Sequence, residues 1–102
     1  MIREKIAGVW FEWDEEKSAQ CFQRRGLTFG VAAQVFFDEN AVVSPNMEWK
    51  GEERFQILGR ISEADLIVVV FVVRENDGQE SYRIISARKA IASEEVEYGR
   101  RY

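Results

Sequence analysis

The sequence contains no histidine, and it has only one cysteine and one proline among its 102 residues. The absence of histidine removes the side chain best matched to proton transfer near neutral pH. The single cysteine, Cys21, excludes a disulfide within the chain. Without histidine a zinc site would rely mostly on carboxylates, which is uncommon, so we expect neither a metal ion nor another cofactor.

Long apolar runs are also missing. The longest is LIVVVFVV at residues 66–73, which is far shorter than the roughly 20 residues that a membrane-spanning helix needs. The N-terminus does not combine a basic start with an apolar core, so no secretory signal is predicted. We therefore expect a cytoplasmic protein with no membrane partner.

The composition that is present indicates a compact globular protein. Hydrophobic residues make up 46% of the chain and aromatic residues 13%, which is enough apolar surface for one core. We therefore expect a single domain over residues 1–102. The net charge of −4 and the pI near 4.9 argue against broad nonspecific binding to nucleic acid, although they are compatible with a local basic cleft.

The first third of the chain predicts one strand and two helices. Residues 7–13 are aromatic and weakly alternating, which is typical of a short strand. Asp14 is a suitable N-cap for a helix over residues 15–25, which carries glutamates in its first turn and arginines in its last. Thr28 begins a second helix, whose apolar residues recur at helical spacing and which ends near Phe37.

The rest of the chain predicts four strands and a short helix. The strands cover residues 41–44, 54–60, 66–74 and 81–88, with a tight turn at Asn76, Asp77 and Gly78. Residues 92–101 predict a helix with Ser93 as its N-cap. The third of these strands is almost entirely apolar, so we expect helices on one of its faces and a partner as a candidate cover for the other.

The predicted fold class is therefore α+β. The order of elements is strand, helix, helix, four strands and helix, with the helices on one face of an antiparallel sheet of four to five strands.

Cations occur on defined faces of two predicted strands. Because strand side chains alternate between faces, Arg54 and Arg60 share one face of their strand. By the same alternation, Arg88 points away from the face that carries Arg83 and Lys89. The strand over residues 54–60 is the more informative of the two, because its apolar residues predict which of its faces meets the helices.

A third group of cations lies on the first helix. Lys17, Arg24 and Arg25 share one stripe with Cys21. An ordinary solvated surface would also show such cations, and Cys21 fits a half-buried filler better than a reactive thiol. Capping and solubility explain the paired glutamates before catalysis does, and the three tryptophans fit a core or an interface better than a base-stacking platform.

Four segments follow one another in a characteristic order: FEWDEEKSAQCFQRRGLTF, VFFDENAVV, GEERFQILGR and RIISARKA. Together they resemble the BrnT family of toxins from bacterial type II toxin–antitoxin systems. The resemblance runs from about Phe11 to Ala90, and the ordered succession is far more specific than any one segment.

The resemblance implies a fold similar to that of RelE-type ribonucleases and a toxin that cleaves RNA without a metal ion, which blocks translation. It also implies a BrnA-like antitoxin partner that neutralises the toxin and represses the operon through its own DNA-binding domain. DNA would then be contacted only through the antitoxin. A homodimer is a further arrangement that the sequence leaves open.

The resemblance also assigns the cations to RNA. The positions that the family fills with the same residue types are Lys17, Arg54, Arg60, Arg83, Arg88 and Lys89. We expect Arg54 and Arg88 to clamp phosphate during catalysis, and the others to bind RNA together with Arg24 and Arg25. Glu53 is the candidate general base.

One departure from the family motif bears on activity. The family ends its first helix with Lys-His-Gly, whereas this chain has Arg24, Arg25 and Gly26, and Cys21 replaces an asparagine. Arg25 stays protonated and cannot act as a general base. If the histidine transfers protons in relatives, this chain is slow or inactive, whereas if it positions phosphate, Arg25 substitutes for it.

The sequence is therefore compatible with two specific functions. The first is a ribonuclease toxin, and the alternative is a BrnT-like binding module with weak or lost catalysis that pairs with a DNA-binding antitoxin in operon repression. A small structural domain with scattered surface charge is the third and least informative interpretation.

Overall fold

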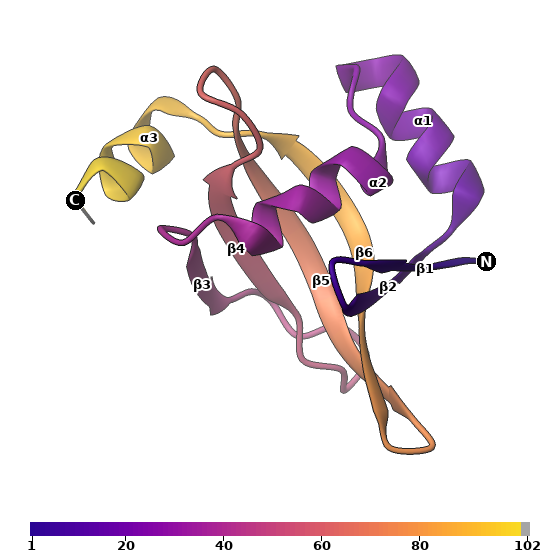
Figure 1. Cartoon of the computed structure of the whole chain (residues 1–102). Helices are drawn as coiled ribbons and strands as arrows, with labels where there is room; N and C mark the ends of the chain where they lie inside the picture. The colour runs from indigo at the N-terminus through magenta and orange to yellow at the C-terminus, as the bar shows by residue number, and fades with distance from the viewer. Residues whose placement is uncertain (101–102) are drawn as a thin grey trace.

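The structure, a computed structural model, describes residues 1–100. Figure 1 shows the elements along the chain, which are β1 (Ile2–Ile6), β2 (Val9–Trp13), α1 (Glu15–Arg25), α2 (Phe29–Ala32), the 3₁₀-helix η1 (Ala33–Phe37), β3 (Val42–Pro45), β4 (Phe55–Arg60), β5 (Leu66–Asn76), β6 (Gln79–Lys89) and α3 (Ala92–Gly99). The strands form one sheet of six in the order β1-β2-β6-β5-β4-β3. None of the described helices is long and apolar enough to cross a membrane.

The α+β class is confirmed, but the predicted sheet of four to five antiparallel strands is wrong. β2 and β6 pair in parallel, and all other pairs are antiparallel. The missed strand is β1, which forms a hairpin with β2 through a two-residue turn at Ala7 and Gly8, both at positive φ. The predicted strand over residues 7–13 is therefore this turn followed by β2.

Local capping explains why the predicted helices form where they do. Asp14 accepts hydrogen bonds from the backbone N–H groups of Glu16 and Lys17 at the start of α1. Thr28 accepts from the N–H of Val31 in the same way, and the helical segment continues from α2 into η1. The first predicted helix is thus confirmed, and the second has its predicted start and end but is α-helical only over Phe29–Ala32 and 3₁₀-helical over Ala33–Phe37.

The C-terminal helix starts differently from the prediction. Ile91, and not Ser93, is the N-cap, because the carboxylate of Glu94 accepts from the N–H of Ile91. Residue 101, at the predicted end of this helix, lies outside the described residues.

Both faces of the sheet are covered, but by different helices. On one face, Phe29 and Val35 from α2 and η1 pack against Ile57 and Val69 of the central strands. On the other face, Tyr98 of α3 packs against Leu58 and its neighbours. The expectation that all helices lie on one face is therefore wrong, and α3 covers part of the surface of β5 that was left for a partner. α3 lies at the opposite end of the molecule from α1 (Figure 1).

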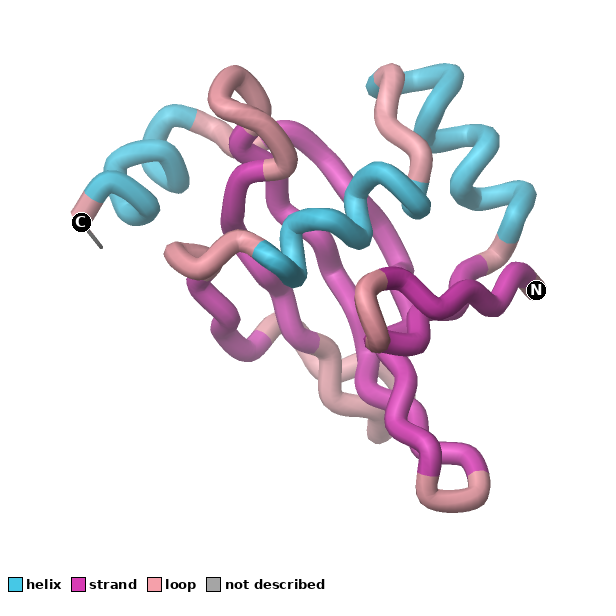
Figure 2. Tube along the Cα trace, in the orientation of Figure 1, coloured by secondary structure: helices cyan, strands magenta, loops and turns pink. Residues whose placement is uncertain are grey.

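A bulge in β6 changes which side chains share a face. Val70 pairs with Ser86 whereas Phe71 pairs with Ile84, so Ile85 is an extra residue in the ladder. The long β5–β6 hairpin in which this bulge lies projects beyond the rest of the sheet (Figure 2).

The bulge reverses the alternation on which the sequence prediction relied. Arg83 and Arg88 pair with Val72 and Val68, which lie on the same face of β5. The prediction that Arg83 and Arg88 face opposite ways is therefore wrong. Both lie on the face that α3 partly covers, whereas Lys89 lies on the face that carries α1 and α2.

Candidate functional site

A hollow of about 290 Å³ lies between α1 and β6. It is lined by side chains from both elements, which include Lys17, Cys21, Arg24 and Arg25 from α1 and Ser86 and Ala87 from β6. The stripe predicted on the first helix thus faces this hollow.

The sheet topology explains why the hollow exists. β2 pairs with β6 only at Phe11–Tyr82 and Glu12–Arg83. Beyond Arg83, β6 has no strand beside it on that side, and α1 packs there instead. The last turn of α1 therefore brings its cations to an open strand edge, next to the bulged segment.

Contacts to one backbone carbonyl fix the end of α1 against β6. Arg25 Nη1 donates a hydrogen bond to the carbonyl oxygen of Ala87 at 2.7 Å, and the buried thiol of Cys21 donates to the same oxygen at 3.3 Å. Within residues 1–100, Lys17 and Arg24 make no ion pair, because the ion pairs there involve Arg74, Arg83 and Arg88. Two of the three cations in the hollow are therefore available to a bound anion.

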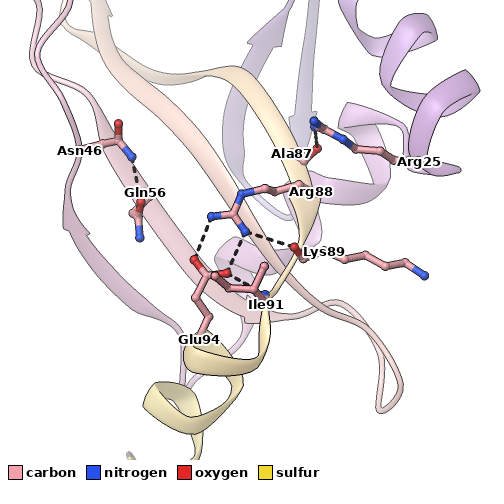
Figure 3. Close-up of polar contacts among 8 residues, drawn as sticks. All are labelled: Arg25, Asn46, Gln56, Ala87, Arg88, Lys89, Ile91 and Glu94. Atoms are coloured by element: carbon pink, nitrogen blue, oxygen red, sulfur yellow. Dashed lines mark hydrogen bonds and ion pairs between the residues drawn. The ribbon is translucent and has the colours of Figure 1, made fainter.

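Arg88 leaves the same stretch of β6 on the other side of the sheet. Its two terminal nitrogens donate to both carboxylate oxygens of Glu94 on α3, at 2.8 and 2.9 Å, and Nη1 also donates to the carbonyl oxygen of Lys89 (Figure 3). The hydrogen bond from Arg88 holds the pKa of Glu94 below its usual value although burial opposes this, and Glu94 raises the pKa of Arg88.

Arg54, the other predicted clamp, and Arg83, a predicted RNA-binding residue, lie on the same face as Arg88. Arg83 donates to Glu12, which is buried, at 3.0 Å. Arg54 directly precedes β4, and its guanidinium lies 5.5 Å from the ring centre of Trp49, while its Nε is buried without a hydrogen-bond partner. The structure therefore brings Arg54, Arg83 and Arg88 to one face, but two of the three are paired with carboxylates.

Arg60 also lies on this face, because it pairs with Leu66 and its guanidinium lies 5.2 Å from the ring centre of Tyr98, whereas Lys89 lies on the other face. Both residues line a polar cleft of about 320 Å³ near the N-terminal end of α3, together with the carboxylates of Asp65 and Glu95. Glu53, the candidate general base, is exposed in the segment before β4 and lines neither this cleft nor the hollow. The predicted site residues thus divide among three neighbouring places.

Sequence reasoning did not find two features of this region. Glu94 was predicted only as part of the C-terminal helix, although its position six residues after Arg88 was the available signal for an ion pair. Trp49 is half exposed, unlike the buried Trp13, because a tight turn at Lys50 and Gly51 holds it away from the core. The positive φ of that turn is not visible in the pattern of hydrophobic residues.

Comparison with known proteins shows the family and agrees with the fold. The chain matches the family model described as the ribonuclease toxin BrnT of type II toxin–antitoxin systems over residues 13–94. The 1.1 Å crystal structure of the Brucella abortus ribonuclease toxin BrnT has a similar fold, with a TM-score of 0.61 and 24% identity, covering 79% of this chain and 95% of that one. No curated protein matches the chain. Because the family model spans most of the sequence, the chain belongs to the BrnT family of type II toxin–antitoxin ribonuclease toxins.

Proposed function

We propose that the protein is a ribonuclease toxin that engages RNA around the C-terminal end of β6 and is neutralised by a BrnA-like antitoxin. The observation that carries this proposal is the hollow between α1 and β6, which gathers Lys17, Arg24 and Arg25 in a chain with a net charge of −4. A concentration of cations at the open edge of a β-strand suits the phosphates of single-stranded RNA.

The chemistry that fits these residues is cleavage without a metal ion. The ribose 2′-hydroxyl gives its proton to a base and its oxygen attacks the adjacent phosphorus, while the bond from phosphorus to the 5′-oxygen of the next nucleotide breaks. The products are a 2′,3′-cyclic phosphate and a 5′-hydroxyl, whose oxygen takes a proton from water. Negative charge accumulates on the phosphate oxygens in the transition state. Arg25 is already oriented by Ala87 and can hold one such oxygen with its remaining donors. Cleavage of messenger RNA in this way would block translation, as RelE-type ribonucleases do.

The remaining cations extend the proposed RNA path across the molecule. Arg54, Arg83 and Arg88 serve the sheet face, with Arg54 and Arg88 as clamps. Arg60 and Lys89 continue the path into the cleft near the N-terminal end of α3. Glu53 is retained as a candidate base only if the RNA spans from the hollow to the segment before β4.

A second candidate function is a binding module that pairs with a DNA-binding antitoxin in operon repression and has weak or lost catalysis. Two observations favour it. The chain has no histidine, and both terminal nitrogens of the Arg88 guanidinium are bound by the Glu94 carboxylate. In both functions the partner is an antitoxin and DNA is reached only through it, with a homodimer of the toxin as an additional assembly.

The test is growth of a bacterial host after induced expression of the chain alone. We expect growth arrest by the wild type and relief by Lys17→Ala or Arg24→Ala, whereas Lys5→Ala on β1, outside the hollow, leaves arrest unchanged. Equal toxicity of all variants would reject the hollow as the RNA site. A harmless wild type that becomes toxic as Arg25→His would favour the binding module.

A further inference from the structure

The carboxylate of Glu94 lies where a phosphate would lie on Arg88. Both of its oxygens accept from the two terminal nitrogens of the guanidinium, at 2.8 and 2.9 Å (Figure 3). Arginine binds phosphate through the same parallel pair of N–H donors. A phosphodiester and Glu94 therefore compete for the same two nitrogens.

α3 holds this carboxylate in place from two sides. Glu94 Oε1 also accepts from the N–H of Ile91 at 2.9 Å, which fixes the side chain at the first turn of the helix. At the other end, Tyr98 is 2% exposed among Val42, Leu58 and Val68, and its hydroxyl donates to Asp38 at 2.7 Å. The carboxylate is thus presented to Arg88 by a docked helix rather than by a free chain end.

We propose that Glu94 acts as an internal competitor of RNA phosphate, so that α3 masks Arg88 in the free protein. The proposal rests on the proposed RNA function and adds a form of regulation to the part of the proposed RNA path that crosses Arg88. Only the Glu94 side chain has to rotate for Arg88 to be released, because Tyr98 anchors α3 independently. The Arg88 side chain is 39% exposed, so incoming RNA can reach it.

A purely structural ion pair would behave differently. If Glu94 served only to dock α3, its removal would loosen the helix and would leave RNA binding unchanged or weaker. If Glu94 masks Arg88, its removal strengthens RNA binding through Arg88. The sign of the change therefore separates the two roles.

The experiment measures binding of a short, fluorescently labelled 2′-O-methyl RNA, which cannot be cleaved because its 2′-oxygen is blocked. The variants are Glu94→Gln, Glu97→Gln, Arg88→Ala and the double variant Glu94→Gln/Arg88→Ala. Glutamine still accepts from the N–H of Ile91, so the start of α3 is preserved. Glu97→Gln removes the same charge from an exposed residue of the same helix, which makes no ion pair among residues 1–100 and does not line the cleft of Arg60 and Lys89.

We expect Glu94→Gln to bind about fivefold more tightly than the wild type, in line with the strength of a partly exposed ion pair. Glu97→Gln should change affinity less, and the double variant should bind no more tightly than Arg88→Ala. Equal effects of Glu94→Gln and Glu97→Gln, or a double variant that binds more tightly than Arg88→Ala, would overturn the mask while leaving RNA binding intact. Failure of every variant to bind RNA would overturn the proposed function and the mask with it.

Discussion

At the scale of single residues, Asp38 joins three segments that are distant in the sequence. Its Oδ2 accepts from the N–H of Arg60 on β4 and from the hydroxyl of Tyr98 on α3, both at 2.7 Å. Its Oδ1 accepts from the N–H of Asn40 in the following turn. One carboxylate thus connects the end of η1, the end of β4 and the helix that carries Glu94.

We expect Asp38→Asn to lower the free energy of unfolding by about 1 to 2 kcal/mol, because hydrogen bonds to a charged acceptor are stronger than those to a neutral one. The measurement is urea denaturation followed by tryptophan fluorescence. Glu39→Gln is the matched control, because Glu39 is exposed and adjacent. The same midpoint for both variants would contradict the role given to Asp38.

The pH dependence of stability follows from Asp38 and Glu94. Burial alone would raise the pKa of Asp38, but the hydrogen bonds from Tyr98, Arg60 and Asn40 outweigh it and lower the pKa, and Arg88 lowers that of Glu94. A carboxyl whose pKa is lower in the folded state stabilises the protein above its unfolded pKa of about 4. That stabilisation is lost as the pH falls through the folded pKa.

Thermal unfolding should therefore become easier as the pH is lowered from about 5 towards 2. The double variant Asp38→Asn/Glu94→Gln should show a shallower fall over the same range, because two of the shifted carboxyls no longer titrate. A melting temperature that falls with pH equally in both proteins would show that other groups dominate.

At the scale of elements, β4 and η1 lie close together at Gly59. A β-carbon at Gly59 would lie 2.9 Å from Asp38 Oδ2 and from Val35 Cγ2, and 3.1 Å from the β-carbon of Ala41. Val35 and Ala41 have short side chains held in packed segments, so they cannot move away easily. The absence of a side chain is what lets η1 lie against the sheet.

Gly59→Ala should therefore destabilise the protein by about 1 to 3 kcal/mol, the usual cost of overpacking. Gly99→Ala is the control, because nothing lies within 4 Å of its added β-carbon and it ends a helix. Chemical denaturation should separate the two variants. Equal stability of Gly59→Ala and Gly99→Ala would contradict the close packing of η1 on β4 at Gly59.

The element scale also shows where sequence reasoning succeeds and where it stops. The caps at Asp14 and Thr28 act on residues within one turn, so both helices were predictable. β1 was missed because IREKI carries charges at three of its five positions and lies at the edge of the sheet, where no apolar pattern is required.

The candidate site was only partly predictable for a similar reason. The stripe of cations on α1 follows from helical periodicity and does face one hollow. The faces of Arg83 and Arg88 depend on the bulge at Ile85, and no glycine or other local signal marks that residue. The pairing of Arg88 with Glu94 depends on where α3 docks, and Tyr98 contributes to this docking through its packing and its hydrogen bond to Asp38.

At the scale of the whole molecule, the proposed RNA binding has to occur on a protein that carries a net charge of −4. Fields from the rest of the surface oppose RNA, so affinity must come from the local cations of the hollow. We expect weak binding that falls steeply as salt is added, with a slope of log affinity against log salt of about −2 for three phosphate contacts. Lys17→Ala should reduce the slope by about 0.7, as measured by fluorescence anisotropy across salt concentrations. A salt-independent affinity would contradict phosphate binding.

The contacts that close the hollow join residues separated by 62 and 66 positions, Arg25 with Ala87 and Cys21 with Ala87. During synthesis on the ribosome, α1 therefore emerges long before the strand edge against which it must pack. Loop closure over such a distance delays folding until both ends are available. The nascent chain has no assembled cation site until β6, one of the last segments to be made, has emerged.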